Sequence, residues 1–164
     1  MTRTAIFPQD RHALYEQHGY SAAIKSEDLL FVSGQVGSRE DGSPEPDFEK
    51  QVERAFENLA ATLAAAGCSF DNIVDVTTFH TDPERQFESI MKVKQQVFNQ
   101  KPYPNWTAVG VTWLAGFDFE IKVIACIPLS ALVISARALG FASQAELRLL
   151  IQLKVQFGIM AHSL

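Results

Sequence analysis

Hydrophobic and polar residues follow a strand-like pattern in the first part of the chain. Three short apolar segments, TRTAIF (2–7), YSAAIK (20–25) and LLFVSG (29–34), are each bounded by polar or turn-forming residues. The turn at 26–28 joins the second and third of these segments and predicts a hairpin. The residues between the first two strands, PQDRHALYEQHG (8–19), predict an irregular polar loop.

A helical period begins after a loop at 35–47 that is rich in Gly, Pro and Asp. Asp47 is a plausible N-cap, and Gly67 can end the helix because glycine adopts the left-handed conformation easily. The apolar residues between them recur at a spacing that places them on one helix face: Phe48, Val52, Ala55, Phe56, Leu59, Leu63 and Ala66.

A second helix is predicted from Asp82-Pro83-Glu84, which supplies a cap, a proline in the first turn and an acid near the positive end of the dipole. It continues to Val97, before Pro102. The segments 71–80, 105–114 and 118–127 read as strands. The predicted order is therefore β-β-β-α-β-α-β-β, an α+β fold in which two helices cover one face of a mixed sheet.

The two faces of this sheet pose a packing problem. LLFV (29–32) and VIACI (123–127) are apolar at both alternating positions, which suits strands buried on both sides. Two helices cover only one of these faces. We expect an oligomer interface to cover the other, and a covering C-terminal tail is the alternative.

The chain changes character after residue 128, and we predict a boundary between a domain at 1–128 and a C-terminal extension at 129–164. The extension carries three cationic residues and one acidic residue, although the whole chain has a net charge of −5. Its Ser143-Gln144-Ala145-Glu146 fits a capping box and predicts a partly helical segment. That helix packs on the core or on a neighbour, or else lies on a membrane surface, for which its cations are few.

Composition narrows the function classes. Hydrophobic residues make up 47% and charged residues 20% of the chain, which is ordinary for a globular protein. The negative net charge gives no basic surface for nucleic acid or an anionic membrane. We find no signal-peptide or membrane-spanning pattern and expect a cytoplasmic protein in which Cys68 and Cys126 are buried thiols.

Few residues form a pattern of known chemistry by spacing alone. His80 and Asp82 could form a triad with Ser33, but a His-Thr-Asp turn before a helix is far more typical of a helix cap. The remaining histidines and the two cysteines lack metal-ligand spacing, and the glycines form no nucleotide-binding loop. We therefore predict neither a metal nor a cofactor.

Three long segments resemble one protein family: YSAAIKSEDLLFVSGQVG (20–37), ENLAATLAAAGCSFDNIVDVTTFHTD (57–82) and FEIKVIACIP (119–128). With them, residues 1–128 resemble the Rid/YjgF family, and most of all its YjgH branch. The extension has no counterpart in the family. It is either a native extension or the product of read-through or a frameshift.

The resemblance implies a chorismate-mutase-like fold and a homotrimer with a cleft between each pair of neighbours. In enzymes of the family, these clefts hydrolyse reactive imines or enamines derived from amino acids, giving a 2-oxo acid and ammonia. Such chemistry needs an arginine to hold the substrate carboxylate and an enzyme carboxylate to position water.

The resemblance also assigns residues to this cleft. Tyr20 stands at the family's cleft tyrosine, Ser33 and Gly34 in its SGQ motif, and Glu120 at the glutamate that positions water. Trp106, next to Asn105, stands where the family has its arginine, and Ala108 where it has a cysteine. An indole has one N–H and no charge, so it cannot replace a guanidinium, and Arg39 in the long loop is the remaining candidate donor.

Several interpretations stay open. Trp106 is either a platform for a planar or cationic ligand or a plug that packs a closed cleft or the trimer interface. Glu120 orients water or pairs with a cation such as Lys122, and Ser33 binds ligand or caps a turn. We predict a trimer that binds a small, largely planar molecule and hydrolyses an imine-like C–N bond with Glu120. The alternative is a non-catalytic ligand-sensing or protein-binding trimer.

Overall fold

The computed structural model describes residues 3–9 and 14–128. The predicted extension at 129–164, with its capping box and helix, lies outside this part of the chain. The described elements, in chain order, are β1 (Arg3–Ile6), α1 (Leu14–Gln17), β2 (Ala23–Ser26), β3 (Leu29–Val36), α2 (Phe48–Ala65), the 3-10 helix η1 (Phe70–Asn72), β4 (Ile73–His80), α3 (Pro83–Val97), β5 (Asn105–Gly110) and β6 (Phe119–Cys126).

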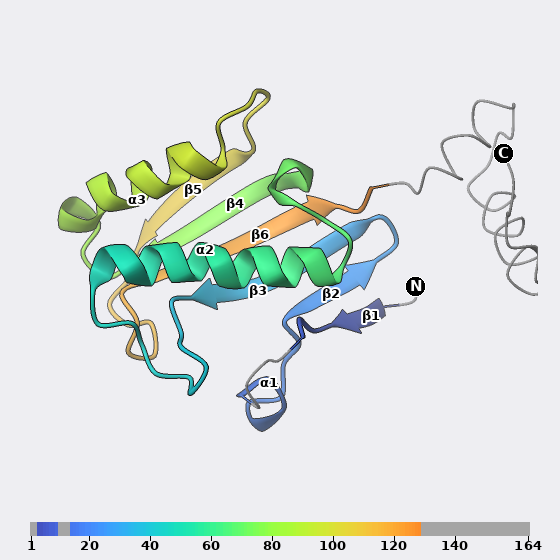
Figure 1. The fold of residues 1–164 in the computed structure, drawn as a ribbon, viewed down its shortest axis with the longest axis horizontal. Helices are drawn as coiled ribbons and strands as arrows, with labels where there is room; N and C mark the ends of the chain where they lie inside the picture. Colours follow the sequence, from blue (N-terminus) through green and yellow to red (C-terminus); the bar gives the residue numbers. More distant parts are fainter. Residues whose placement is uncertain (1–2, 10–13, 129–164) are drawn as a thin grey trace, which may run out of the picture. The chain divides into compact units, whose positions relative to one another are not determined.

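The strands form one mixed sheet in the order β1-β2-β3-β6-β4-β5. Every neighbouring pair is antiparallel except β4 and β5, which are parallel and are connected through α3. Helices α2 and α3 lie side by side on one face of the sheet (Figure 1). The predicted α+β fold, with two helices on one face of a mixed sheet, is confirmed.

Local signals explain where the helices begin and end. The Asp47 side chain accepts a hydrogen bond from the Lys50 backbone N–H at 3.0 Å, so it caps α2 as predicted. Gly67 follows α2 with a φ of 71°, a conformation that favours glycine. Pro83 occupies the first turn of α3, where a missing N–H has no cost.

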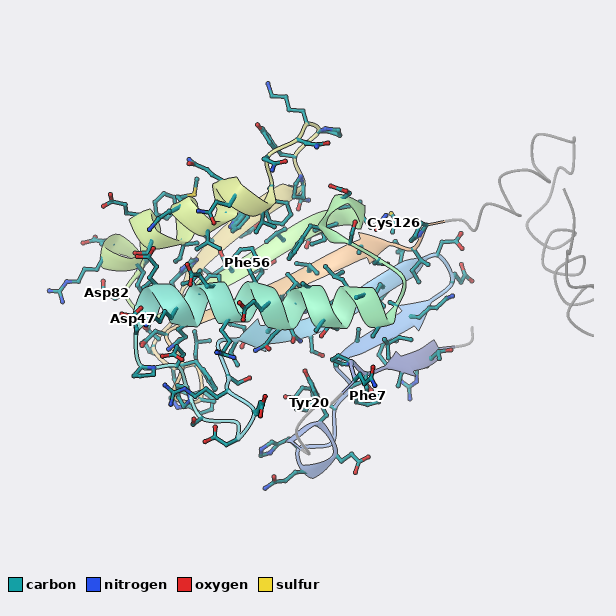
Figure 2. The ribbon with its side chains drawn as sticks, in the orientation of Figure 1. Phe7, Tyr20, Asp47, Phe56, Asp82 and Cys126 are labelled. Atoms are coloured by element: carbon teal, nitrogen blue, oxygen red, sulfur yellow. The ribbon has the colours of Figure 1, made fainter. Side chains whose placement is uncertain are left out.

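The core fills the space between the two helices and the sheet. Alternate residues of β6 point into it, and Phe119, Ile121 and Val123 are fully buried. Phe56 of α2 stacks on Phe119 with 6.2 Å between ring centroids (Figure 2 labels Phe56). Because the side chains of β6 alternate, the residues between these, including Glu120, lie on the opposite face of the sheet.

That opposite face carries exposed apolar side chains in the protomer. Phe31 of β3 is 42% exposed, and the register places it between Ile24 of β2 and Ile124 of β6. Leu29, two residues earlier on β3, is 38% exposed. Neither α2 nor α3 covers these positions, as the sequence pattern implied, and an oligomer interface over this face stays a prediction.

Four details differ from the sequence-based expectation. The predicted loop at 8–19 contains α1, and Ser69 and Asn72 form a capping box that turns 70–72 into η1, so β4 begins later than predicted. Strand β5 ends at Gly110 instead of residue 114, because its neighbour β4 ends at the paired His80. Cys68 is buried as expected, but Cys126 is exposed because it lies on the uncovered face.

None of the helices in the described ranges is both long enough and apolar enough to pass through a bilayer.

Candidate functional site

The site begins at an irregularity in β3. The pairing of β3 with β6 shifts register between Val32 and Gln35, so Ser33 and Gly34 together stand opposite one residue of β6. This β-bulge reverses the alternation of β3: Val32 and Gln35 are both buried. The Gln35 side-chain amide donates to the Ser33 carbonyl at 2.9 Å and accepts from the Thr62 hydroxyl at 3.4 Å, which holds the bulge against α2.

Gly34 provides the space for Glu120. The Glu120 side chain crosses the backbone of Gly34 so closely that a Cβ atom at position 34 would overlap its carboxylate. Glu120 is paired with Val36 on β3 and with Phe79 on β4, so it sits in the middle of the sheet. The SGQ motif therefore has a physical meaning: Ser33 and Gln35 fix the bulge, and Gly34 lets the carboxylate lie across it.

The environment of Glu120 disfavours the ionised form of its carboxyl group. Its side chain is half buried, and desolvation raises the pKa of its carboxyl above the usual range, an effect that the charge of Lys122 partly offsets. Within the described residues no side chain or backbone N–H donates a hydrogen bond to this carboxylate, and Lys122 forms no ion pair with it. A desolvated, unpaired carboxylate is a common feature of functional sites.

Glu120 lines a pocket of about 370 Å³. The wall of the pocket comes from α1 and the turn after it, from β3 and the loop that follows, and from the loop between β5 and β6. Its lining residues are Tyr15, His18, Tyr20, Gly34, Gln35, Val36, Ser38, Gly42, Trp113, Leu114, Ala115, Phe117 and Glu120. A cavity of this size accommodates a small metabolite.

Tyr20 is held in place by neighbouring rings. Tyr15, which is buried, makes edge-to-face contacts with Tyr20 at 4.9 Å and with Phe7 at 5.7 Å between centroids. Figure 2 shows Phe7 and Tyr20 close together beside the N-terminal strands. Such packing fixes the ring of Tyr20, which remains 44% exposed at the pocket.

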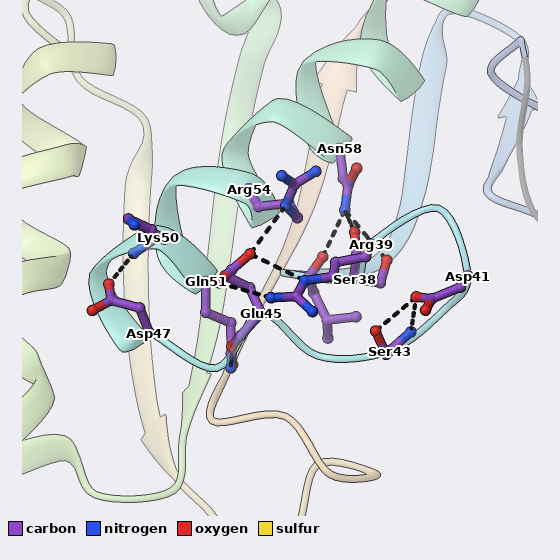
Figure 3. A network of polar contacts seen from close by, with 11 residues as sticks. Ser38, Arg39, Asp41, Ser43, Glu45, Asp47, Lys50, Gln51, Arg54 and Asn58 are labelled. Carbon is purple, nitrogen blue, oxygen red and sulfur yellow. Dashed lines mark hydrogen bonds and ion pairs between the residues drawn. The ribbon is translucent and has the colours of Figure 1, made fainter.

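The loop between β3 and α2 is tied to α2 by polar contacts (Figure 3). Arg39 forms two hydrogen bonds with the Glu45 carboxylate, each at 3.2 Å, and Asn58 donates to the Val36 carbonyl at 2.8 Å. Arg39 is thereby engaged in its own loop and does not line the pocket, so it does not act as the donor that we considered from the sequence.

Gln51 of α2 links this loop to the one between β5 and β6. It is 2% exposed. Its amide donates to the Glu45 carbonyl at 2.9 Å and accepts from the backbone N–H groups of Asp118 and Phe119 at 2.7 and 3.3 Å. One buried side chain therefore connects two loops that line the pocket.

The loop at 111–118 supplies residues that sequence reasoning missed. Trp113 and Phe117 line the pocket, but Trp113 had been placed inside a predicted strand. Ala115 and Gly116 adopt positive φ angles of 53° and 93°, which turn the chain back towards β6. A glycine between two apolar segments, here Gly116, is a sequence signal of such a turn, and the end of β5 at Gly110 places Trp113 outside the sheet.

Trp106 lies elsewhere in the protomer. It pairs with Val76, and because Glu120 pairs with Phe79, alternation along β4 puts the indole and the carboxylate on opposite faces of the sheet. The indole Nε1–H donates to the Thr78 hydroxyl at 3.0 Å, the ring packs edge-to-face on Phe98, and the Lys94 ammonium lies 4.3 Å from the ring centroid. Asn105, at the start of β5, does not line the pocket either.

Ser33 and His80, two other candidates from the sequence, form hydrogen bonds within the protein. The Ser33 hydroxyl donates to the Ser21 carbonyl at 2.7 Å, so it supports the turn beside the pocket. His80 is buried on the helix side of the sheet with Nε2 at 2.8 Å from the Thr78 hydroxyl, and it does not contact Ser33. The structure therefore forms no triad from Ser33, His80 and Asp82. Nor does any group of three or more potential metal ligands gather within the described ranges.

The sequence of this chain is similar to those of several known proteins. Residues 10–127 match the family described as endoribonuclease L-PSP. The chain is 76% identical over 126 residues to a RutC family protein, YjgH, of Escherichia coli K12, a match that covers 77% of this chain and 96% of that protein. It is 32% identical over 110 residues to TdcF of the same organism, whose name assigns it to the reactive intermediate deaminases; 65% of this chain and 84% of TdcF are covered.

Solved structures give the same result. A structure of protein YjgH matches with a TM-score of 0.76 and 74% sequence identity, and the match covers 79% of this chain and all of that one. The mixed sheet with its few helices is thus the fold of these relatives.

Proposed function

Since the chain belongs to the YjgF/Rid family that the endoribonuclease L-PSP model describes, we propose that it binds a small molecule in the Glu120 pocket and hydrolyses an imine, an enamine or a related C–N bond. The observation that carries this proposal is Glu120 itself. Its carboxylate is half buried, has a raised pKa and is unpaired within the described residues, and it lines a pocket large enough for a metabolite.

The reaction follows from the properties of this carboxylate. Glu120 accepts a proton from a water molecule while the water oxygen bonds to the carbon of the C=N group. The π electron pair moves to nitrogen, which takes up a proton from solvent and leaves a carbinolamine. When the C–N bond breaks, Glu120 donates its proton to the departing amine, the carbinolamine hydroxyl releases its proton to solvent, and a carbonyl compound remains. A raised pKa favours the first step because it makes the Glu120 carboxylate a stronger base.

We do not propose efficient deamination of 2-imino carboxylates. The substrate carboxylate would need a charged donor, and the described residues that line the pocket include neither lysine nor arginine. Trp106, at the family's arginine position, has its N–H and one ring face engaged by Thr78 and Lys94. The loss of a charge-assisted hydrogen bond of this kind costs about 1.5–3 kcal/mol in substrate affinity.

We also propose that the chain assembles as a homotrimer in the cytoplasm and that neighbouring protomers complete the pocket. The exposed apolar residues of the uncovered sheet face, among them Phe31, support an interface there. In such an assembly, Asn105 and Trp106 of one protomer could approach the Glu120 pocket of the next, as the family resemblance implies. No nucleic acid is proposed as a partner, because the net charge is −5 and the pocket exposes a carboxylate.

The experiment measures ammonia or amine release from freshly generated imines with and without a carboxylate. We expect slow turnover of 2-iminopropionate and faster turnover of imines that lack a carboxylate. Glu120→Gln removes the base and Gly34→Ala displaces the Glu120 side chain, so both should abolish activity. Gly110→Ala is the matched control, since its Cβ would meet Pro83 at an ordinary distance of 3.4 Å, away from the pocket.

Rapid turnover of 2-iminopropionate, at the rate of arginine-containing relatives, would contradict the substrate restriction. Full activity in Glu120→Gln would contradict the mechanism.

A non-catalytic ligand sensor or protein-binding trimer is the second candidate. It is favoured by the same observation on Trp106, whose contacts leave no replacement for the family's arginine. If Glu120→Ala still binds ligand and no imine is ever hydrolysed by the unmodified protein, this second function is the correct one.

A further inference from the structure

The Glu120 pocket combines a negatively charged group with aromatic side chains. Glu120 contributes a carboxylate, while Tyr15, Tyr20, Trp113 and Phe117 contribute aromatic rings. The described part of the lining contains no lysine or arginine, although His18 is present. Arg39, the nearest arginine of the adjoining loop, is bonded to Glu45. Among the described lining residues, the charge that a ligand meets is therefore negative.

From this combination we propose that the pocket selects small organic cations with a flat apolar body, such as protonated amines and iminium ions, over carboxylate-bearing anions of the same shape. This proposal rests on the proposed function, because it names the class of substrate for the same pocket. It departs from the family resemblance, which implies a substrate that carries a carboxylate.

Electrostatics favour the cation. Glu120 is half buried, and among the described residues none donates a hydrogen bond to its carboxylate, so none of them compensates its ionised form in that way. Lys122 offsets this only in part; it is exposed, and it does not line the pocket. A cation in contact with the carboxylate supplies the missing partner, whereas an anion adds a second like charge in a partly desolvated space.

The aromatic rings favour the same class of ligand. Trp113 is 75% exposed at the pocket, and Tyr20 is 44% exposed beside it. An indole face attracts cations because of its quadrupole, and tryptophan is the strongest side chain in this respect. The chain contains such a pair elsewhere, because Lys94 Nζ lies over the Trp106 ring at 4.3 Å from the centroid. Trp113 presents the same kind of ring to the pocket.

The loop that carries Trp113 is shaped and anchored beyond this residue. Its loop returns through the positive-φ pair Ala115 and Gly116, and Gln51 anchors the end of the loop at Asp118. Tyr20, which also lines the pocket, is held by Tyr15. The aromatic side chains and the Glu120 carboxylate thus line one cavity, in which a flat cation can contact both kinds of group.

The test uses three probes with the same ring and different charge: benzylamine, benzyl alcohol and benzoate. Dissociation constants for the full-length protein at pH 7.5 come from chemical-shift titrations, which also report whether the amides of Ser38 and Phe117 are affected. Benzylamine should bind at least about tenfold more tightly than benzoate, with benzyl alcohol between them.

Two variants separate the contributions. Glu120→Gln should remove the preference for benzylamine over benzyl alcohol. Trp113→Leu should weaken benzylamine about two- to fivefold and change benzyl alcohol less. Trp113 is exposed, so its replacement does not threaten the fold, which thermal unfolding checks for both variants.

Equal or tighter binding of benzoate in the unmodified protein would overturn the proposal, and so would an unchanged preference in Glu120→Gln. The outcome is separable from that of the proposed reaction. Cation preference without imine hydrolysis refutes the reaction and leaves the selectivity, whereas hydrolysis without cation preference does the reverse.

Discussion

At the scale of single residues, the half-buried carboxyl group of Glu120 lowers the stability of the folded protein when it is ionised. Its pKa is raised because burial disfavours the charged form, so the folded state holds its proton more strongly than the unfolded state does. The resulting cost to stability is absent below the ordinary glutamate pKa and grows as pH rises through the folded pKa. Glu120→Gln should therefore raise the free energy of unfolding at pH 7 by about 0.5–2 kcal/mol.

Urea unfolding of the variant and the unmodified protein at several pH values measures this difference. The advantage of Glu120→Gln should shrink as the pH falls and should be absent well below the ordinary glutamate pKa, where Glu120 is protonated in both the folded and the unfolded state. Glu57→Gln, an exposed position on α2, is the control and should change stability little at either pH. An equal or lower stability of Glu120→Gln at pH 7 would contradict the assigned desolvation.

At the scale of elements, Gln51 joins the two loops that frame the pocket. Gln51→Leu leaves the N–H groups of Asp118 and Phe119 without their acceptor and should cost about 1–3 kcal/mol. Gln51→Glu keeps an acceptor for both groups, but it cannot donate to the Glu45 carbonyl and it buries a carboxylate, so it should also lower the free energy of unfolding.

Amide hydrogen exchange tests this connection. In Gln51→Leu, exchange should accelerate in the loops at 37–47 and 111–118, while the loop at 98–104 stays unchanged. Acceleration confined to one of the two pocket loops would show that Gln51 does not couple them.

The sequence predicted elements better than it predicted the site, for reasons visible in particular residues. Asp47 and Pro83 are local signals, so the starts of α2 and α3 could be read directly. The end of β5 depended on the length of β4, which is a property of the pairing. Trp106 and Glu120 are separated because their side chains lie on opposite faces of the sheet. The family resemblance matched their positions in the sequence but did not show on which face each side chain lies.

At the scale of the whole molecule, we propose that the uncovered sheet face forms the assembly interface. Phe31 is exposed in the protomer, so Phe31→Asp should leave each protomer folded but should break the proposed trimer by placing a charge in an apolar interface. Light scattering coupled to size-exclusion chromatography measures the mass. Phe87→Asp, at a residue of α3 that is 52% exposed on the other side of the sheet, is the matched control and should remain trimeric.

A trimer that persists in Phe31→Asp would place the interface elsewhere. A monomeric unmodified protein would contradict the assembly altogether.

The bulge at Ser33 and Gly34 has a consequence for how this protein can change over generations. A regular strand tolerates the exchange of one side chain for another. In β3, however, Val32 and Gln35 lie three residues apart and both face the helix layer only because the bulge adds one residue between them. Loss of Gly34 by a three-nucleotide deletion would leave a regular strand in which Gln35 still faces the helix layer and Val36 still faces the uncovered side. The acid would then lose its passage across the strand, although every chemical group of the pocket would still be encoded.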